Sequence, residues 1–72
     1  LFKSGKTDKA LELLAEAARG MPDNAEVQYH YAAALASAGR KNDALPFARK
    51  AVAGALPPAV RADATRLLAE IQ

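Results

Sequence analysis

The sequence contains no cysteine, no tryptophan, a single histidine and no long apolar run. Without cysteine, the chain has neither disulfide bonds nor a thiolate metal site, so apolar contacts must hold the fold together. No apolar run approaches the roughly 20 residues that span a membrane, so direct membrane insertion is not expected. The 72 residues suit one small domain. A domain of this size buries only about 60% of the surface of its unfolded chain.

An excess of charge of one sign is also missing. Ten lysines and arginines stand against eight aspartates and glutamates, which leaves a net charge of +2. The densest basic group consists of Arg40, Lys41, Arg49 and Lys50. No aromatic residues are placed beside this group to stack bases, as nucleic-acid binding would require. We therefore expect a solvated helix face here and no nucleic-acid partner.

The side chains that could carry chemistry do not converge. Tyr29, His30 and Tyr31 are adjacent, so on a helix they point in three directions. A lone histidine without a cysteine or a second histidine nearby is not a metal site, and His30 is expected to be a half-buried packing residue. We predict no catalytic, cofactor-binding or metal-binding residues, no cofactor and no enzymatic activity.

What the sequence does contain is an internal repeat. When the chain is shifted by thirty-four residues, six positions are identical, in the pairs Leu1/Leu35, Gly5/Gly39, Ala10/Ala44, Leu11/Leu45, Ala17/Ala51 and Gly20/Gly54. Similar residues fill some of the gaps, with Lys6 over Arg40 and Asp8 over Asn42. A period of this length is typical of helical repeat proteins, in which each unit buries its apolar face against the next.

The segment Gly-Lys-Thr at residues 5–7 raises an alternative, because these are the last letters of a phosphate-binding P-loop. The first glycine of that motif would stand one residue ahead of Leu1, and Leu1 and Phe2 would obstruct the approach of a phosphate. The second copy of this turn, at Gly39, lacks the Lys-Thr pair. We therefore expect Gly5 and Gly39 to serve equivalent turns between helices, and a nucleotide site is the disfavoured reading.

Turn and cap signals divide the chain into three helices after a short helical end at residues 1–4, with a fourth at the C-terminal end. Thr7 or Asp8 can cap the first helix, which is expected to end at Gly20. Gly20 itself is expected to adopt the left-handed conformation. The second is expected from Asp23 to Gly39, where Glu26, three residues after Asp23, predicts a capping box.

Prolines set the later boundaries. The third helix is expected to begin near residues 42–43, because Pro46 is tolerated in a first turn and not deeper, and to end at Gly54. Pro57 and Pro58 separate the last helix, roughly residues 59–71. Its apolar face consists of Val60, Ala64, Leu67, Leu68 and Ile71.

Small residues recur where antiparallel helices would cross. Ala32, Ala44 and Ala51 occupy such positions, and a methyl group lets two helix backbones approach to about 8–10 Å. We predict that Ala44 is buried against the helix that includes residues 24–38.

These residues resemble a tetratricopeptide repeat, a thirty-four-residue helix pair with the pattern W-x2-L-G-x2-Y, A-x3-F and P. The matching places in residues 25–58 hold Gln28, Tyr31, Ala32, Leu35, Ala44 and Ala48, with Pro57 one residue late. The resemblance implies an all-α superhelix of antiparallel helix hairpins. In that scheme, residues 1–24 are the second half of one repeat, residues 25–56 are a full repeat and residues 57–72 are a C-terminal capping helix. It also implies further repeats before Leu1.

The resemblance further implies an adaptor, in which the first helix of each pair lines a concave surface for a peptide or partner helix. Glu26, Tyr29, Ala33 and Ser37 follow one another on such a face and are the candidate partner-binding residues. The alternatives are a plain solvated face and a purely structural cap of a longer array. Chaperone-binding members hold a terminal carboxylate with lysine and asparagine, and Tyr29 and Ala33 occupy those places here, so a carboxylate clamp is not expected.

Residues 25–45 are also similar to the C-terminal ends of bacterial tetratricopeptide lipoproteins associated with PEP-CTERM/exosortase and exopolysaccharide export systems. This similarity implies an envelope scaffold facing the periplasm. The sequence itself leaves the compartment open between the bacterial periplasm or envelope and the cytoplasm.

The first full helix has one partner helix in this chain. Its apolar stripe includes Leu11, Leu14 and Ala18, and part of that stripe is expected to face water or another molecule. We therefore predict that this stretch of chain on its own self-associates through this face, whereas the full-length protein uses the same face internally to continue its superhelix.

Overall fold

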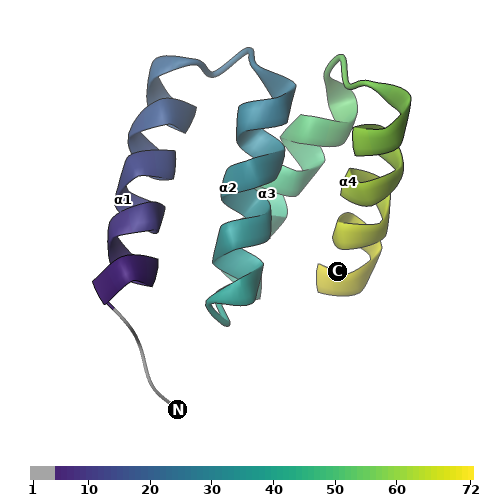
Figure 1. The fold of residues 1–72 in the computed structure, drawn as a ribbon. Coiled ribbons are helices and arrows are strands. Elements are labelled where there is room, and N and C mark those ends of the chain that lie inside the picture. The colour runs from purple at the N-terminus through teal and green to yellow at the C-terminus, as the bar shows by residue number, and fades with distance from the viewer. Residues whose placement is uncertain (1–4) are drawn as a thin grey trace.

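The computed structural model describes residues 5–72, and within this range the chain forms four helices and no strand (Figure 1). They are α1 (Gly5–Gly20), α2 (Ala25–Ser37), α3 (Lys41–Ala53) and α4 (Pro58–Ile71). Successive helices run antiparallel, and α3 lies behind α2 and α4 in the view of Figure 1. The predicted all-α architecture is confirmed. The helical end expected at residues 1–4 lies outside the described residues.

Helix α1 differs from the prediction at both ends. It begins at Gly5, so Thr7 and Asp8 lie within the helix. At the other end, Gly20 does not adopt the left-handed conformation, which among the described glycines belongs to Gly39 alone. The amide of Met21 still donates to the Ala17 carbonyl over 2.9 Å, so the helical bonding continues past Gly20. Pro22, which has no N–H to donate, follows immediately and ends the helix.

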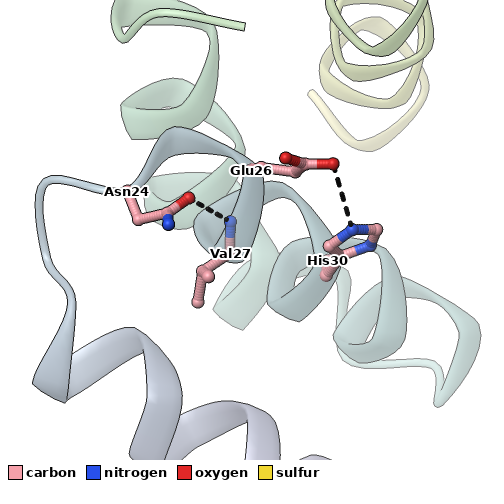
Figure 2. A network of polar contacts seen from close by, with 4 residues as sticks. All are labelled: Asn24, Glu26, Val27 and His30. Carbon is pink, nitrogen blue, oxygen red and sulfur yellow. Dashed lines mark hydrogen bonds and ion pairs between the residues drawn. The ribbon is translucent and has the colours of Figure 1, made fainter.

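Helix α2 is capped by Asn24. The side-chain Oδ1 of Asn24 accepts a hydrogen bond from the backbone N–H of Val27 over 3.1 Å (Figure 2). This bond satisfies one of the free N–H groups of the first turn, the role expected of Asp23. The predicted capping box is therefore wrong, and the Glu26 side chain lies near His30 instead.

The end of α2 is a glycine-dependent turn. The amide of Arg40 donates to the Leu35 carbonyl over 2.8 Å, and the amide of Gly39 donates to the Ala36 carbonyl over 3.1 Å. This pair of bonds is the Schellman motif, which requires a left-handed residue between the helix and the next segment. Gly39 has that conformation, with a φ of 82°.

Helix α3 begins earlier than predicted. Its bonding starts with the amide of Ala44, which donates to the Arg40 carbonyl over 3.0 Å, so Lys41 is the first helical residue. Pro46 consequently lies inside the helix and beyond its first turn. Proline there deprives the Asn42 carbonyl of its usual donor. Both Pro46 and Asn42 are exposed, so water can take the place of that donor.

The core consists mainly of alanine. Five alanines, one or more on each of α2, α3 and α4, are fully buried, and they are Ala32, Ala44, Ala48, Ala51 and Ala64. The expected burial of Ala44 between α2 and α3 is confirmed, and these two helices have the most extensive contact in the fold. Tyr31 and Phe47 pack edge to face beside them, with ring centroids 4.6 Å apart.

Glycine at position 54 is required by space. A Cβ built on Gly54 would lie 2.7 Å from the Cβ of Ala25, closer than real side chains approach one another. Gly54 has an ordinary φ of −96°, so its backbone conformation does not demand glycine. The end of α3 therefore rests directly on the first residue of α2.

Two long polar side chains join neighbouring helices, one between α1 and α2 and the other between α3 and α4. Gln28 is buried, and its Nε2 donates to the carbonyls of Ala18 and Met21 over 3.1 Å each. Arg61, on α4, donates from its Nη1 to the Val52 carbonyl over 2.9 Å and from its Nη2 to the Gly54 carbonyl over 2.6 Å. Each side chain therefore bonds two carbonyls at or just after the end of the preceding helix, where carbonyls lack donors from the next turn. The Met21 carbonyl also accepts from the amide of Asn24 over 3.0 Å.

Helix α4 closes the fold on the side away from α1. Its predicted apolar face is confirmed, because Ala64 and Ile71 are buried and Val60, Leu67 and Leu68 are half-buried.

Candidate functional site

The candidate site is an open groove between α2 and α4, with a volume of about 510 Å³. The two helices lie side by side in Figure 1, and the start of α3 contributes to one end of the groove. We call it the α2–α4 groove. Its lining residues are Ala33, Ala36, Ser37, Lys41, Leu67, Glu70 and Ile71.

The structure brings two of the four predicted contact residues into this groove. Ala33 and Ser37 line it. Tyr29 is half-buried and Glu26 is exposed on the part of α2 nearer its N-terminus, outside the lining. The Glu26 Oε2 lies 4.0 Å from the His30 Nε2 (Figure 2). Glu26 and Tyr29 therefore extend the surface along α2 without forming the groove itself.

Sequence reasoning missed the remaining lining residues as site residues because they belong to other helices. It predicts Leu67 and Ile71 only as packing residues of α4, and Lys41 only as part of a dispersed basic group. The repeat is the feature of the sequence that could have indicated them. Helix α4 follows α3 as α2 follows α1, so α4 takes the place of the first helix of the next repeat and lies beside α2. Which of its residues reach the groove depends on how the two helices lie together.

The groove has an apolar floor and a charged rim. Alanine methyl groups and the side chains of Leu67 and Ile71 supply apolar surface, while Lys41 and Glu70 supply opposite charges. Ser37 adds a hydroxyl that can donate or accept a hydrogen bond. Such a surface can hold aliphatic side chains and pair with charges on either side of them.

Of the three residues considered for chemistry, Tyr29 and His30 lie next to each other and Tyr31 lies elsewhere, against the core. Tyr31 packs against Phe47, while the rings of Tyr29 and His30 are tilted with centroids 5.4 Å apart. The prediction that His30 is a half-buried packing residue is wrong, because His30 is exposed, with 56% of its side-chain surface accessible. His30 sits on the outer side of α2, where packing against α1 or α3 does not cover it. Among the described residues, no three histidine, cysteine or acidic side chains are placed to hold a metal ion.

A second hollow, of about 330 Å³, lies at the start of α3 and is lined by residues 39–43. It corresponds to the Gly-Lys-Thr turn at residues 5–7, whose side chains lie outside the described residues. The Arg40 Nε is 3.5 Å from the Asp43 Oδ2. The lining of the hollow therefore holds two cations, Arg40 and Lys41, and the carboxylate of Asp43.

None of the helices in residues 5–72 has the length together with the apolar character required to cross a membrane.

Comparison with known proteins gives one match. The family model described as Tetratricopeptide repeat matches residues 1–71. Neither the curated proteins nor the solved structures contain a chain that matches.

Proposed function

The chain belongs to the tetratricopeptide repeat family, and we propose that it is an adaptor that binds a peptide or a partner helix in the α2–α4 groove. Repeats of this family generally mediate contacts between proteins. The observation that carries the proposal is the groove itself, whose lining combines the apolar side chains of Leu67 and Ile71 and two alanines with the charges of Lys41 and Glu70.

The groove chemistry defines the partner segment. Aliphatic side chains of the partner would lie on Leu67 and Ile71 and exclude water from them. An acidic residue would pair with Lys41 and a basic residue with Glu70. Because both charges are at the rim, they contribute more to the orientation and specificity of the segment than to its affinity.

The predicted contact residues retain a place in this proposal. Ala33 and Ser37 contact the segment within the groove, while Tyr29 and Glu26 meet its continuation along α2. Ala33 matters through its small size, because a longer side chain there would fill part of the groove that it lines. In the same scheme, residues 1–24 complete a repeat that begins before Leu1, residues 25–56 form a full repeat and residues 57–72 form the cap.

Selection from a random peptide-display library tests this function. The chain would be used to select binders, and the selected peptide would be titrated against Ala33→Arg and against Ala62→Arg as a matched control. Ala62 is exposed on α4 and does not line the groove. We expect Ala33→Arg to weaken binding at least about tenfold, or about 1.4 kcal/mol, with no effect of Ala62→Arg. Selection that enriches no peptide, or equal affinities of the two variants, would reject the proposal.

A purely structural cap is the second candidate. The outer side of α4 favours this function, because it carries no large exposed apolar side chain. The only such side chains in the described chain are Leu13, on α1, and Met21, just after α1. The outer side of α4 therefore suits contact with water, as in a terminal repeat. In this case groove substitutions would leave every interaction of the protein unchanged.

The place of action is proposed from sequence similarity alone. On the likeness of residues 25–45 to bacterial exosortase-associated lipoproteins, we propose an envelope scaffold facing the periplasm. Fractionation of cells that produce the native protein tests this, and recovery from the cytoplasm alone would contradict it.

A further inference from the structure

The α2–α4 groove is short along the helix axes. On α2 its lining extends from Ala33 to Ser37, and on α4 from Leu67 to Ile71. Each stretch is little more than one turn of helix, or about 6 Å at a rise of about 1.5 Å per residue. The apolar surface that a partner segment meets in the groove therefore has the length of a single helical turn.

The turn after α2 limits the groove at one end. Helix α2 ends at Ser37, and Gly39, with a φ of 82°, turns the chain towards α3. Lys41, the first residue of α3, is exposed and lines the groove at this turn. The groove therefore ends at a charged side chain on this side.

Polar side chains limit the groove at its other end. On α2, the turn before the lining carries Tyr29 and His30, and neither of them lines the groove. The His30 Nε2 lies 4.0 Å from the Glu26 Oε2, and both side chains are more than half exposed (Figure 2). On α4, the exposed Asp63 stands one turn before the lining. A longer apolar partner surface would take these polar groups out of water, at a cost in free energy.

We propose that the α2–α4 groove holds one aliphatic side chain of an extended partner segment, and that it does not hold the face of a partner helix. This inference rests on the proposed function and specifies its partner. A helix in a groove presents apolar residues at i, i+3 or i+4, and i+7, in a row about 10 Å long. That row exceeds the apolar stretch, so one of its ends would lie against the polar groups beyond it.

An extended segment fits the same length. Successive side chains of such a segment point to opposite sides, and those that point the same way are about 7 Å apart. One side chain therefore enters the groove while its two neighbours point out of it. Their charges meet the rim, where an acidic neighbour pairs with Lys41 and a basic neighbour with Glu70.

The lining selects an aliphatic side chain for the groove. Its apolar groups are the side chains of Leu67 and Ile71 and the methyl groups of Ala33 and Ala36. No aromatic ring is part of this lining, so an aromatic anchor would gain nothing from ring stacking. The partner segment is therefore one aliphatic residue between polar or charged residues.

Selection on the whole chain from two peptide-display libraries of equal diversity tests the proposal. In the extended library, one leucine stands among random polar residues, with prolines three residues before it and directly after it to keep the segment extended. In the helical library, leucines at i, i+3, i+4 and i+7 form one face of an otherwise polar, alanine-rich helix. We expect the extended library to be enriched and the helical library not to be.

Titration of the enriched peptides then tests the site and the anchor. We expect Ala33→Arg to weaken the extended peptides at least about tenfold, and replacement of the peptide's leucine by alanine to do the same. The matched control Ala62→Arg should leave their affinity unchanged, and circular dichroism checks that both variants keep their helices.

Each contrary result identifies what fails. Helical peptides that bind and are weakened by Ala33→Arg would overturn the extended segment and leave the proposed function standing. Extended peptides that bind equally well with alanine in place of leucine would overturn the single anchor. Enrichment from neither library, or binding that Ala33→Arg does not weaken, would overturn both the inference and the proposed function.

Discussion

The side-chain amide of Gln28 donates a hydrogen bond to the carbonyl oxygen of Ala18 over 3.1 Å. The same nitrogen donates to the Met21 carbonyl, so one side chain of α2 satisfies two carbonyls at the end of α1. Gln28 is only 1% exposed, and its Oε1 has no hydrogen-bond partner in the described part of the chain. A polar side chain therefore joins α1 to α2 at the position where the repeat pattern has tryptophan.

We expect Gln28→Glu to destabilise the fold by about 3 kcal/mol or more, because a carboxylate would face two carbonyl oxygens in a buried site. Gln28→Met should cost less, since it keeps the volume and also removes the unpartnered Oε1. Urea unfolding followed by circular dichroism measures both. Equal losses in the two variants would show that the hydrogen bonds to α1 contribute nothing.

Gly54→Ala should destabilise by about 1–3 kcal/mol, because the new Cβ would lie against the Cβ of Ala25 and force the ends of α2 and α3 apart. Gly20→Ala is the matched control, since a Cβ at Gly20 meets nothing within 4 Å. As Gly20 is helical, that change should stabilise by about 0.5–1 kcal/mol. Thermal or urea unfolding separates the two.

A double-mutant cycle strengthens this prediction. Ala25→Gly removes the methyl group that Gly54→Ala would meet, so the alanine at position 54 should cost less in the Ala25→Gly background. If the cost is the same in both backgrounds, the contact between these two residues is not the cause of the loss.

Gly39→Ala should destabilise by about 1–2 kcal/mol, because its φ of 82° is unfavourable for a residue with a Cβ. Space is not the reason, since a Cβ there meets nothing within 4 Å. Gly39→Asn should therefore recover part of the loss, as asparagine tolerates the left-handed conformation better. Unfolding midpoints that are equal for alanine, asparagine and glycine would contradict this account.

Arg61→Ala should loosen α4 without unfolding the rest of the chain. The substitution removes both guanidinium hydrogen bonds to the end of α3. Hydrogen exchange should become faster in α4 than in α2, and Arg61→Lys should behave like Arg61→Ala, because one ammonium does not reproduce the planar fork that reaches both carbonyls. Unchanged exchange in α4 would show that its apolar face alone holds it in place.

Much of the fold could be predicted from local signals. Gly39 and Gly54 lie at helix ends, and Ala32 and Ala44 lie where helices cross. Both placements follow from rules of residue spacing and size that act within a few residues. The errors lie where neighbouring residues compete for one role. Asn24, rather than Asp23, caps α2, and the backbone bond of Met21 carries α1 through Gly20.

The site could be predicted only in part. Ala33 and Ser37 could be found because their spacing places them on one side of a single helix, and that spacing can be read from the sequence. Lys41 and Glu70 reach the same groove from α3 and α4. Their nearness depends on how the helices cross, and no spacing along the chain encodes it.

The sequence by itself determined the helices, their order and the alanines between them, because hydrogen bonding and side-chain spacing along one helix are local properties. Only the tertiary structure decided which surfaces remain open. Leu13 and Leu14 are adjacent leucines in one helix, yet Leu13 is 61% exposed and Leu14 is half-buried. The difference arises because α2 covers one side of α1 and no described helix covers the other.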